Sequence, residues 1–168
     1  GMELEVQEIK SLHAEFKSQL KLSDLADENI QSRIRALILM ADSNNSGRLL
    51  LSTGNKSEIA VGYSTIYGDS AGGFAPLKDV YKTEVYELAN FRNTITPVIP
   101  ASSITKAPTA ELREDQHDQQ SLPDYGVLDS MLRVLIENHG SIQDLIDLGY
   151  SQSLAKDVAS KLKNAEWK

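Results

Sequence analysis

The sequence predicts a helix-rich α/β fold with few strands. Apolar residues recur at helical spacing through most of the chain, whereas only residues 48–53 form a short apolar run bounded by turn residues, as in a buried strand. An isolated strand is not a stable unit. Either the helices form a bundle of their own, or the chain is part of a larger sheet-based domain, and the sequence leaves both arrangements open.

The first elements are expected to be two helices and a turn. An amphipathic helix is predicted over residues 3–20. Ser23 or Asp24 can cap a second helix. Its predicted apolar face comprises Ile30, Ile34, Leu37, Ile38 and Ala41. The Asn- and Ser-rich composition of residues 42–47 predicts a turn that leads into the strand.

After the strand we expect a short helix near residues 56–61 and a glycine-rich loop over residues 63–76, long enough to suggest a function. A helix is predicted over residues 77–93, and an irregular stretch over residues 94–123. Three short helices then close the chain. They are predicted over residues 125–137, from a Ser141 cap to a stop at Gly149, and from a Ser151 cap onward.

Composition limits the possible functions. The chain has 168 residues, of which 24 are acidic and 17 basic, with a net charge of −7. This length suits one compact domain. The acidic balance argues against general nucleic-acid binding, which needs a basic face. An anionic small molecule would have to be held by a few local cations and backbone N–H groups.

Other features of the composition exclude whole classes of site. The lack of cysteine excludes disulfides, zinc–thiolate sites and cysteine nucleophiles. No apolar run approaches the roughly 20 residues that cross a bilayer, and no signal peptide is visible. We therefore expect a cytoplasmic protein with no membrane partner. Gly1 before Met2 is typical of a tag-cleavage remnant.

The run TGNKSE, residues 53–58, is the strongest candidate site, because ligands of open α/β sheets bind where a strand ends and a helix begins. Gly54 lets the backbone approach a ligand, and the helix N-terminus offers N–H groups to an anion. Thr53 supplies a hydroxyl, and Glu58 a hard oxygen that can hold Mg²⁺. The alternative is an ordinary turn in which Thr53 caps the helix.

Further candidates are weaker one by one. Lys82 lies early on the helix after the glycine-rich loop, and the KAPTAE run places Lys106 beside the hydroxyl of Thr109. Arg33 and Arg35 lie near the polar edge of their helix. Solvated side chains and surface ion pairs are the ordinary explanations for all of these. The histidines show neither metal-ligand spacing nor a nucleophile partner.

The order of these motifs closely resembles the glutamine-dependent NAD⁺ synthetases. The resemblance covers roughly residues 25–168 and rests on ENIQSRIRALILMADSN, LSTGNKSEIAVGYSTIYGDSAGGFAPLKDVYKTEVYELANF, ITKAPTAELREDQHDQQSLPDYGVLDSML and the terminal KLKNAEWK. It implies a partial adenine-nucleotide-α-hydrolase-like (Rossmann-like) fold. Residues 1–22 would form an N-terminal helix, and residues 23–168 the C-terminal portion of the synthetase domain.

The resemblance also implies an activity. Members of the family use ATP to adenylate deamido-NAD⁺, and ammonia then displaces AMP to give NAD⁺; in the longer members an amidase domain releases that ammonia from glutamine. Mg²⁺ and lysines would neutralise the charge of the two polyanionic substrates. The implied ligands and partners are Mg²⁺, ATP, deamido-NAD⁺, ammonia or glutamine, and a second copy of the chain in a homodimer.

Roles carry over by motif position. The residues that resemble ATP contacts are Thr53, Lys82 and Thr109, and Glu58 resembles the Mg²⁺ ligand. The residues that match deamido-NAD⁺ contacts are Arg33, Trp167 and Lys168. Asp69 lies in the YGD loop of the family and receives no role.

The sequence lacks three parts that are found in members of the family. It contains no SGGxDS pyrophosphate-binding loop, no preceding βαβ units and no amidase domain. We therefore expect a C-terminal part of a synthetase that is inactive by itself. The alternatives are another ATP pyrophosphatase amidotransferase, such as a relative of GMP synthetase, and a non-catalytic dimerisation or binding module.

Overall fold

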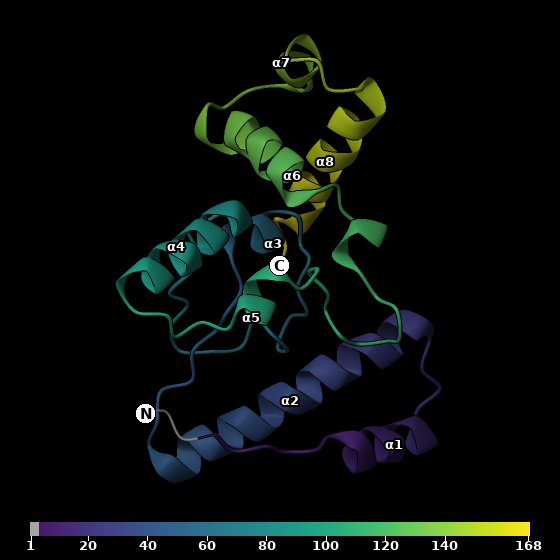
Figure 1. Cartoon of the computed structure of the whole chain (residues 1–168). Helices are drawn as coiled ribbons and strands as arrows, with labels where there is room; N and C mark the ends of the chain where they lie inside the picture. Colours follow the sequence, from purple (N-terminus) through teal and green to yellow (C-terminus); the bar gives the residue numbers. More distant parts are fainter. Residues whose placement is uncertain (1–3) are drawn as a thin grey trace. The chain divides into compact units, whose positions relative to one another are not determined.

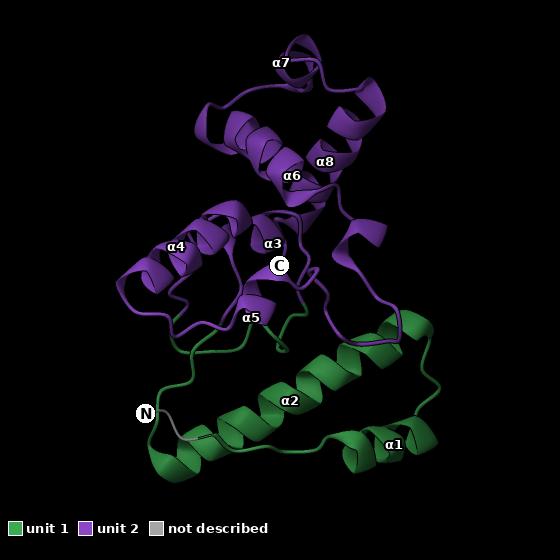
Figure 2. Cartoon of the chain, viewed as in Figure 1, with its two compact units in different colours: residues 1–52, 65–74 green, residues 53–64, 75–168 purple. Residues whose placement is uncertain are grey.

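The computed structural model describes residues 4–168 (Figure 1), so that Gly1, interpreted as a tag remnant, lies outside the described residues. The chain divides into two compact units (Figure 2). Unit 1 comprises residues 1–52 and 65–74, and unit 2 comprises residues 53–64 and 75–168. Over residues 4–168, none of the helices combines the length and the apolar character of a membrane span.

Unit 1 contains the helices α1 (Lys10–Gln19) and α2 (Asp24–Ser46). The predicted cap of α2 is confirmed, because the Ser23 hydroxyl accepts a hydrogen bond from the Ala26 N–H. The predicted turn over residues 42–47 is wrong, since α2 continues to Ser46 and ends at Gly47 in the left-handed conformation, with φ 69°. In the last turn of α2 the Ser46 hydroxyl donates a hydrogen bond to the Asp42 carbonyl. A residue type that is common in turns is thus accommodated within the helix.

The N-terminal helix is shorter than predicted. Residues 4–9 are not helical, and Leu4 and Val6 are 86% and 78% exposed. Helices in proteins depend on packing of their apolar face, and the apolar side chains Leu4 and Val6 pack against nothing in the described part of the chain that would shield them from solvent. Within α1, His13 and Lys17 bind the two carboxylate oxygens of Asp27 at 2.7 and 3.0 Å, which fastens α1 to the start of α2.

The predicted buried strand over residues 48–53 is wrong. Leu51 forms an isolated parallel bridge with Phe74, and no longer strand occurs within residues 4–168. Leu49 and Leu51 are 67% and 49% exposed. One bridge does not supply the neighbouring strands that bury such a run. The helix-rich part of the predicted fold class is therefore confirmed, while the described residues form no Rossmann-like sheet.

Unit 2 is helical. Its elements are α3 (Lys56–Ala60), α4 (Lys82–Ile95), α5 (Ala101–Thr105), a 3₁₀ turn (Asp118–Gln120), α6 (Tyr125–Leu132), a π-helical segment (Arg133–Glu137), α7 (Ile142–Asp147) and α8 (Gln152–Ala165). α4 begins five residues later than the helix predicted over 77–93, and α5 lies within the stretch predicted to be irregular.

Helix α6 lies at the centre of the core of unit 2. Leu128, Met131 and Leu132 are fully buried. They share one hydrophobic cluster with buried side chains of α7 and α8: Leu145, Ala155 and Val158. The capping signals of these two helices are also confirmed. Ser141 caps α7 in a capping box with Asp144, Gly149 follows α7 with φ 96°, and Ser151 caps α8.

Ion pairs join the start of α4 to the segment that continues α6. The Arg133 guanidinium binds the Glu84 carboxylate at 2.6 Å, and the Tyr81 N–H donates to the same carboxylate at 2.9 Å. These two contacts hold the pKa of Glu84 below its usual value. Arg133 also lies over the buried Tyr81 ring, 4.4 Å from its centroid.

We expect Glu84→Gln to lower the free energy of unfolding at pH 7 by less than about 1 kcal/mol, because the pair is partly exposed. A lowered carboxyl pKa stabilises the fold above the ordinary value of 4.5, and this stabilisation is lost as the pH falls through the folded-state pKa. In urea titrations the wild-type chain and the variant should therefore converge as the pH falls below the ordinary value of 4.5 and through the folded-state pKa, with Glu87→Gln on the same helix as control. A constant difference at all pH values would contradict this origin.

Candidate functional site

The candidate site in unit 2 begins at the N-terminus of α3. The Asn55 side chain accepts a hydrogen bond from the Glu58 N–H at 3.0 Å, and the Asn55 N–H donates to Glu58 Oε2 at 3.4 Å, which completes a capping box. The cap is therefore Asn55 and not Thr53, the residue that the alternative interpretation favoured. Thr53 is exposed and lies two residues before the cap.

Glu58 and Lys82 are the two predicted site residues that the structure brings into direct contact. The Lys82 Nζ atom binds Glu58 Oε1 at 2.8 Å, and the two side chains are only 20% and 19% exposed. Lys82 is the first residue of α4, so the pair joins the N-termini of α3 and α4. Neither residue is the solvated surface side chain that composition alone would favour.

An aromatic ring and a buried carboxylate lie next to this pair. Lys82 Nζ lies over the Tyr125 ring, 5.3 Å from its centroid. The Tyr125 hydroxyl donates to Asp118 Oδ2 at 2.7 Å, while the other oxygen of this buried carboxylate accepts no hydrogen bond from the described residues. Burial, and then the contact with Asp118, raise the pKa of Tyr125, so its hydroxyl remains protonated at neutral pH.

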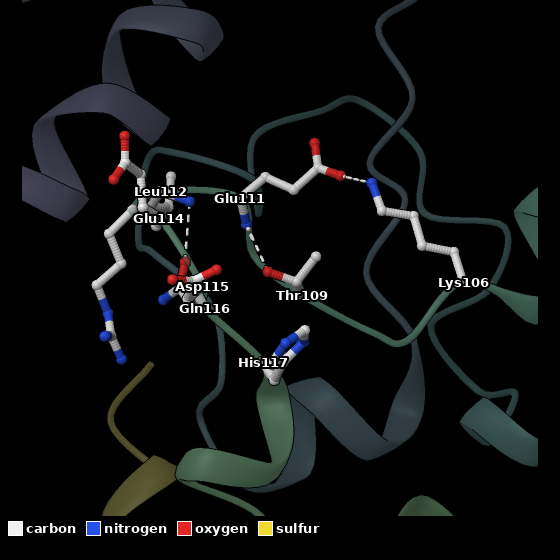
Figure 3. Close-up of a pocket in the computed structure, with 9 residues that line it drawn as sticks. Lys106, Thr109, Glu111, Leu112, Glu114, Asp115, Gln116 and His117 are labelled. Carbon is white, nitrogen blue, oxygen red and sulfur yellow. Dashed lines mark hydrogen bonds and ion pairs between the residues drawn. The ribbon is translucent and has the colours of Figure 1, made fainter.

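Thr109 lies in an open hollow of about 440 Å³ (Figure 3). Its hydroxyl accepts a hydrogen bond from the Glu111 N–H at 3.1 Å, and Glu111 forms an ion pair with Lys106. The hollow is lined by Lys106, Thr109, Glu111, Leu112, Arg113, Glu114, Asp115, Gln116 and His117.

The Thr109 turn is connected to Lys82 through Asp118. The Asp118 N–H donates to the carbonyl of Pro108, directly before Thr109, at 3.0 Å. The Asp118 carboxylate in turn holds the Tyr125 hydroxyl beneath Lys82. The sequence analysis missed both Asp118 and Tyr125, because their contacts depend on tertiary packing and no local spacing signals them.

Lys168 also lies in unit 2, at the end of the chain. Its Nζ atom donates to the carbonyls of Gly62 and Ser64 at 2.5 and 2.8 Å, so the C-terminus lies against the loop that follows α3. A side chain at Gly62 would crowd this contact, since a Cβ atom there would lie 3.2 Å from Ala165 Cβ. Trp167 is 74% exposed.

Arg33 belongs to unit 1. It lies on α2, half-buried, and its Nε atom donates to the Ile66 carbonyl at 3.1 Å. Its partner is thus the backbone of the YGD loop and not the surface carboxylate that the ordinary explanation predicts. The loop is close to α2 at Gly68, where a Cβ atom would lie 2.4 Å from the Ser32 hydroxyl. The Asp69 carboxylate accepts from Ser32 Oγ and so stabilises this loop.

Few of these residues are suited to holding a metal ion. Over the part of the chain that the structure describes, no group of three or more His, Asp or Glu side chains could hold a metal ion. Glu58 by itself offers one carboxylate. This fits Mg²⁺, which takes one or two protein carboxylates and completes its shell with phosphate and water oxygens.

Comparison with known proteins identifies the family. The chain matches the NAD synthase family over residues 1–168. The chain belongs to the NAD synthase family. The match includes residues 1–22, for which the motifs provided no resemblance.

Individual NAD synthase relatives agree with this. The glutamine-dependent NAD⁺ synthetase of Xanthomonas campestris pv. campestris is 52% identical over 147 residues, which are 86% of this chain and 27% of the relative. The chain therefore spans about a quarter of the length of the curated relatives that it matches. This comparison favours an NAD synthase over the relative of GMP synthetase.

Two solved structures of NAD synthetases are similar in fold to this chain over part of their length. The NH₃-dependent NAD synthetase of Campylobacter jejuni matches with a TM-score of 0.71 and 28% identity, over 94% of this chain and 58% of that one. The glutamine-dependent NAD⁺ synthetase of Acinetobacter baumannii, in complex with ADP, matches with a TM-score of 0.50 and 44% identity, over 90% of this chain and 26% of that one.

Proposed function

We propose that this chain contributes the phosphate-binding side of an NAD⁺ synthetase site, which amidates deamido-NAD⁺ at the expense of ATP. One observation carries the proposal: in a member of the NAD synthase family, Lys82 and Glu58 meet at the start of two helices, largely shielded from solvent. A cation and a carboxylate that are largely shielded from solvent together suit a metal–polyphosphate ligand.

The proposed reaction has two steps. A free carboxylate is a poor electrophile and must be activated before ammonia can react with it. The nicotinate carboxylate of deamido-NAD⁺ therefore attacks the α-phosphorus of ATP, and pyrophosphate leaves. Ammonia then displaces AMP from the adenylate and forms the amide. Glutamine is the proposed source of ammonia, as the names of the curated relatives indicate. A homodimer, implied by the resemblance, and a cytoplasmic location, expected from the composition, stay predictions.

Each predicted residue has a separate task in this proposal. Lys82 neutralises the phosphates and Glu58 holds Mg²⁺, which supplies further charge neutralisation when it is bound. With Glu58 on the metal, Lys82 would be available to contact a phosphate oxygen. Thr53 and Thr109 contact ATP through their hydroxyls. The residues proposed to hold deamido-NAD⁺ are Arg33, Trp167 and Lys168.

We expect the chain to bind Mg·ATP in calorimetric titration, and Lys82→Ala to weaken this binding about 10- to 100-fold. A hydrogen bond that involves a charged group contributes about 1.5–3 kcal/mol. Lys78→Ala is the matched control, because Lys78 is an exposed lysine of the same segment. Equal affinities of the two variants would contradict the role of Lys82.

We expect the chain to bind deamido-NAD⁺ as well, and Arg33→Ala to abolish most of that binding. Arg35→Ala is the control, since Arg35 lies two residues further on α2 and is exposed. The same titration distinguishes the two proposed substrates, because Arg33→Ala should leave the affinity for Mg·ATP unchanged. A deamido-NAD⁺ affinity that tolerates Arg33→Ala would remove Arg33 from the proposal.

We expect the 168 residues by themselves to form no measurable NAD⁺ from deamido-NAD⁺, Mg·ATP and ammonia. The sequence holds no SGGxDS loop to cradle the phosphates, and the loss of a single preorganised donor already costs about 10²–10³ in rate. Chromatographic detection of NAD⁺ checks this. Formation above the level of a Lys82→Ala sample would show that the loop is dispensable.

A further inference from the structure

The N-terminus of α4 is capped by side chains that are distant in sequence. Tyr81, the residue before the helix, makes no cap hydrogen bond through its side chain. Instead the Lys82 N–H donates to Ser57 Oγ at 2.8 Å, and the Thr83 N–H donates to Asp129 Oδ2 at 2.9 Å. The first N–H groups of a helix have no acceptor within the helix. Here α3 and α6 supply one acceptor each.

The two capping groups also bind each other. The Ser57 hydroxyl donates to Asp129 Oδ1 at 2.5 Å. Ser57 is fully buried and Asp129 is 2% exposed. Every polar atom of the pair therefore has a partner: both carboxylate oxygens accept, and the hydroxyl donates once and accepts once. The positive end of the α4 dipole adds to the stabilisation of this buried carboxylate.

This network fixes the backbone from which the Lys82–Glu58 pair extends. Ser57 directly precedes Glu58, and its hydroxyl binds the N–H of Lys82 itself. The backbone positions of the ammonium and of the carboxylate are thus coupled through one side-chain oxygen. Asp129 holds that oxygen in place from α6, the most deeply buried helix of unit 2.

We infer that Ser57 and Asp129 are positioning residues, which hold the Lys82 ammonium beside Glu58 in the geometry that receives the polyphosphate. The identity of the ligand as a polyphosphate rests on the proposed function, whereas the coupling of Lys82 to Glu58 does not. Packing alone would not require this network, because apolar side chains of similar volume often replace a buried polar group without loss of stability.

The first experiment tests the coupling without nucleotide. In Ser57→Ala and in Asp129→Asn we expect the hydrogen of the Lys82 amide to exchange with solvent at least about tenfold faster. The first variant removes the oxygen that accepts from this amide, and the second weakens the hydrogen bond that holds that oxygen in place. We also expect the NMR resonance of the Glu58 carboxyl carbon to move towards its position in Lys82→Ala. Ser141→Ala, which removes the cap of α7 in the same unit, should change neither signal.

Unchanged Lys82 exchange and an unchanged Glu58 resonance in Ser57→Ala would overturn the inference. Ser57→Ala carries this test by itself if Asp129→Asn does not fold. Ser57→Thr keeps the hydroxyl and should restore the wild-type Glu58 resonance. Restoration by a residue without a hydroxyl, such as Ser57→Val, would show that only packing matters.

The second experiment links the network to the ligand. We expect Ser57→Ala to weaken Mg·ATP binding about tenfold, as for the loss of a hydrogen bond, and to leave the affinity for adenosine unchanged, because adenosine has no phosphate for Lys82 to contact. Equal losses for both ligands, or no loss for either, would overturn the positioning role. If the wild-type chain binds no Mg·ATP, the proposed function fails, and the measurements without nucleotide still decide whether Ser57 and Asp129 hold Lys82 to Glu58.

Discussion

A buried carboxylate on the central helix of unit 2 is the constraint on which the start of α4 depends. Asp129 lies among fully buried apolar side chains and is itself 2% exposed. Such a group is costly to bury unless hydrogen bonds satisfy it. It accepts from Ser57 of α3 and from the Thr83 N–H of α4, so three helices must meet in one arrangement. Displacement of any one of them would leave a buried oxygen without a donor.

The chemical features of the candidate site follow from this meeting of helix starts. Glu58 lies in the first turn of α3, and Lys82 is the first residue of α4, so the two side chains extend from neighbouring helix N-termini. Their mutual ion pair balances both charges before a ligand arrives. In the proposed function, Lys82 would be the local cation that a chain with a net charge of −7 offers to an anionic nucleotide, without the basic face that nucleic acid requires.

Agreement between sequence and structure is best where the signal is local. Ser23, Ser141 and Ser151 cap helices as predicted, and the helix predicted over residues 125–137 buries apolar side chains at helical spacing. A cap or a helical stripe depends on a few neighbouring residues and survives in any tertiary context. The strand over residues 48–53 failed for the opposite reason, since strand formation depends on partners elsewhere in the chain.

The sequence by itself determined the family, through long ordered motifs, and the helix-rich character of the chain. Tertiary structure alone decided that Lys82 pairs with Glu58, that Arg33 binds the Ile66 carbonyl, and that Lys168 binds the loop after α3. These contacts mostly join residues far apart in sequence, and their distances are set by packing in the folded chain. Spacing along the sequence therefore carries no information about them.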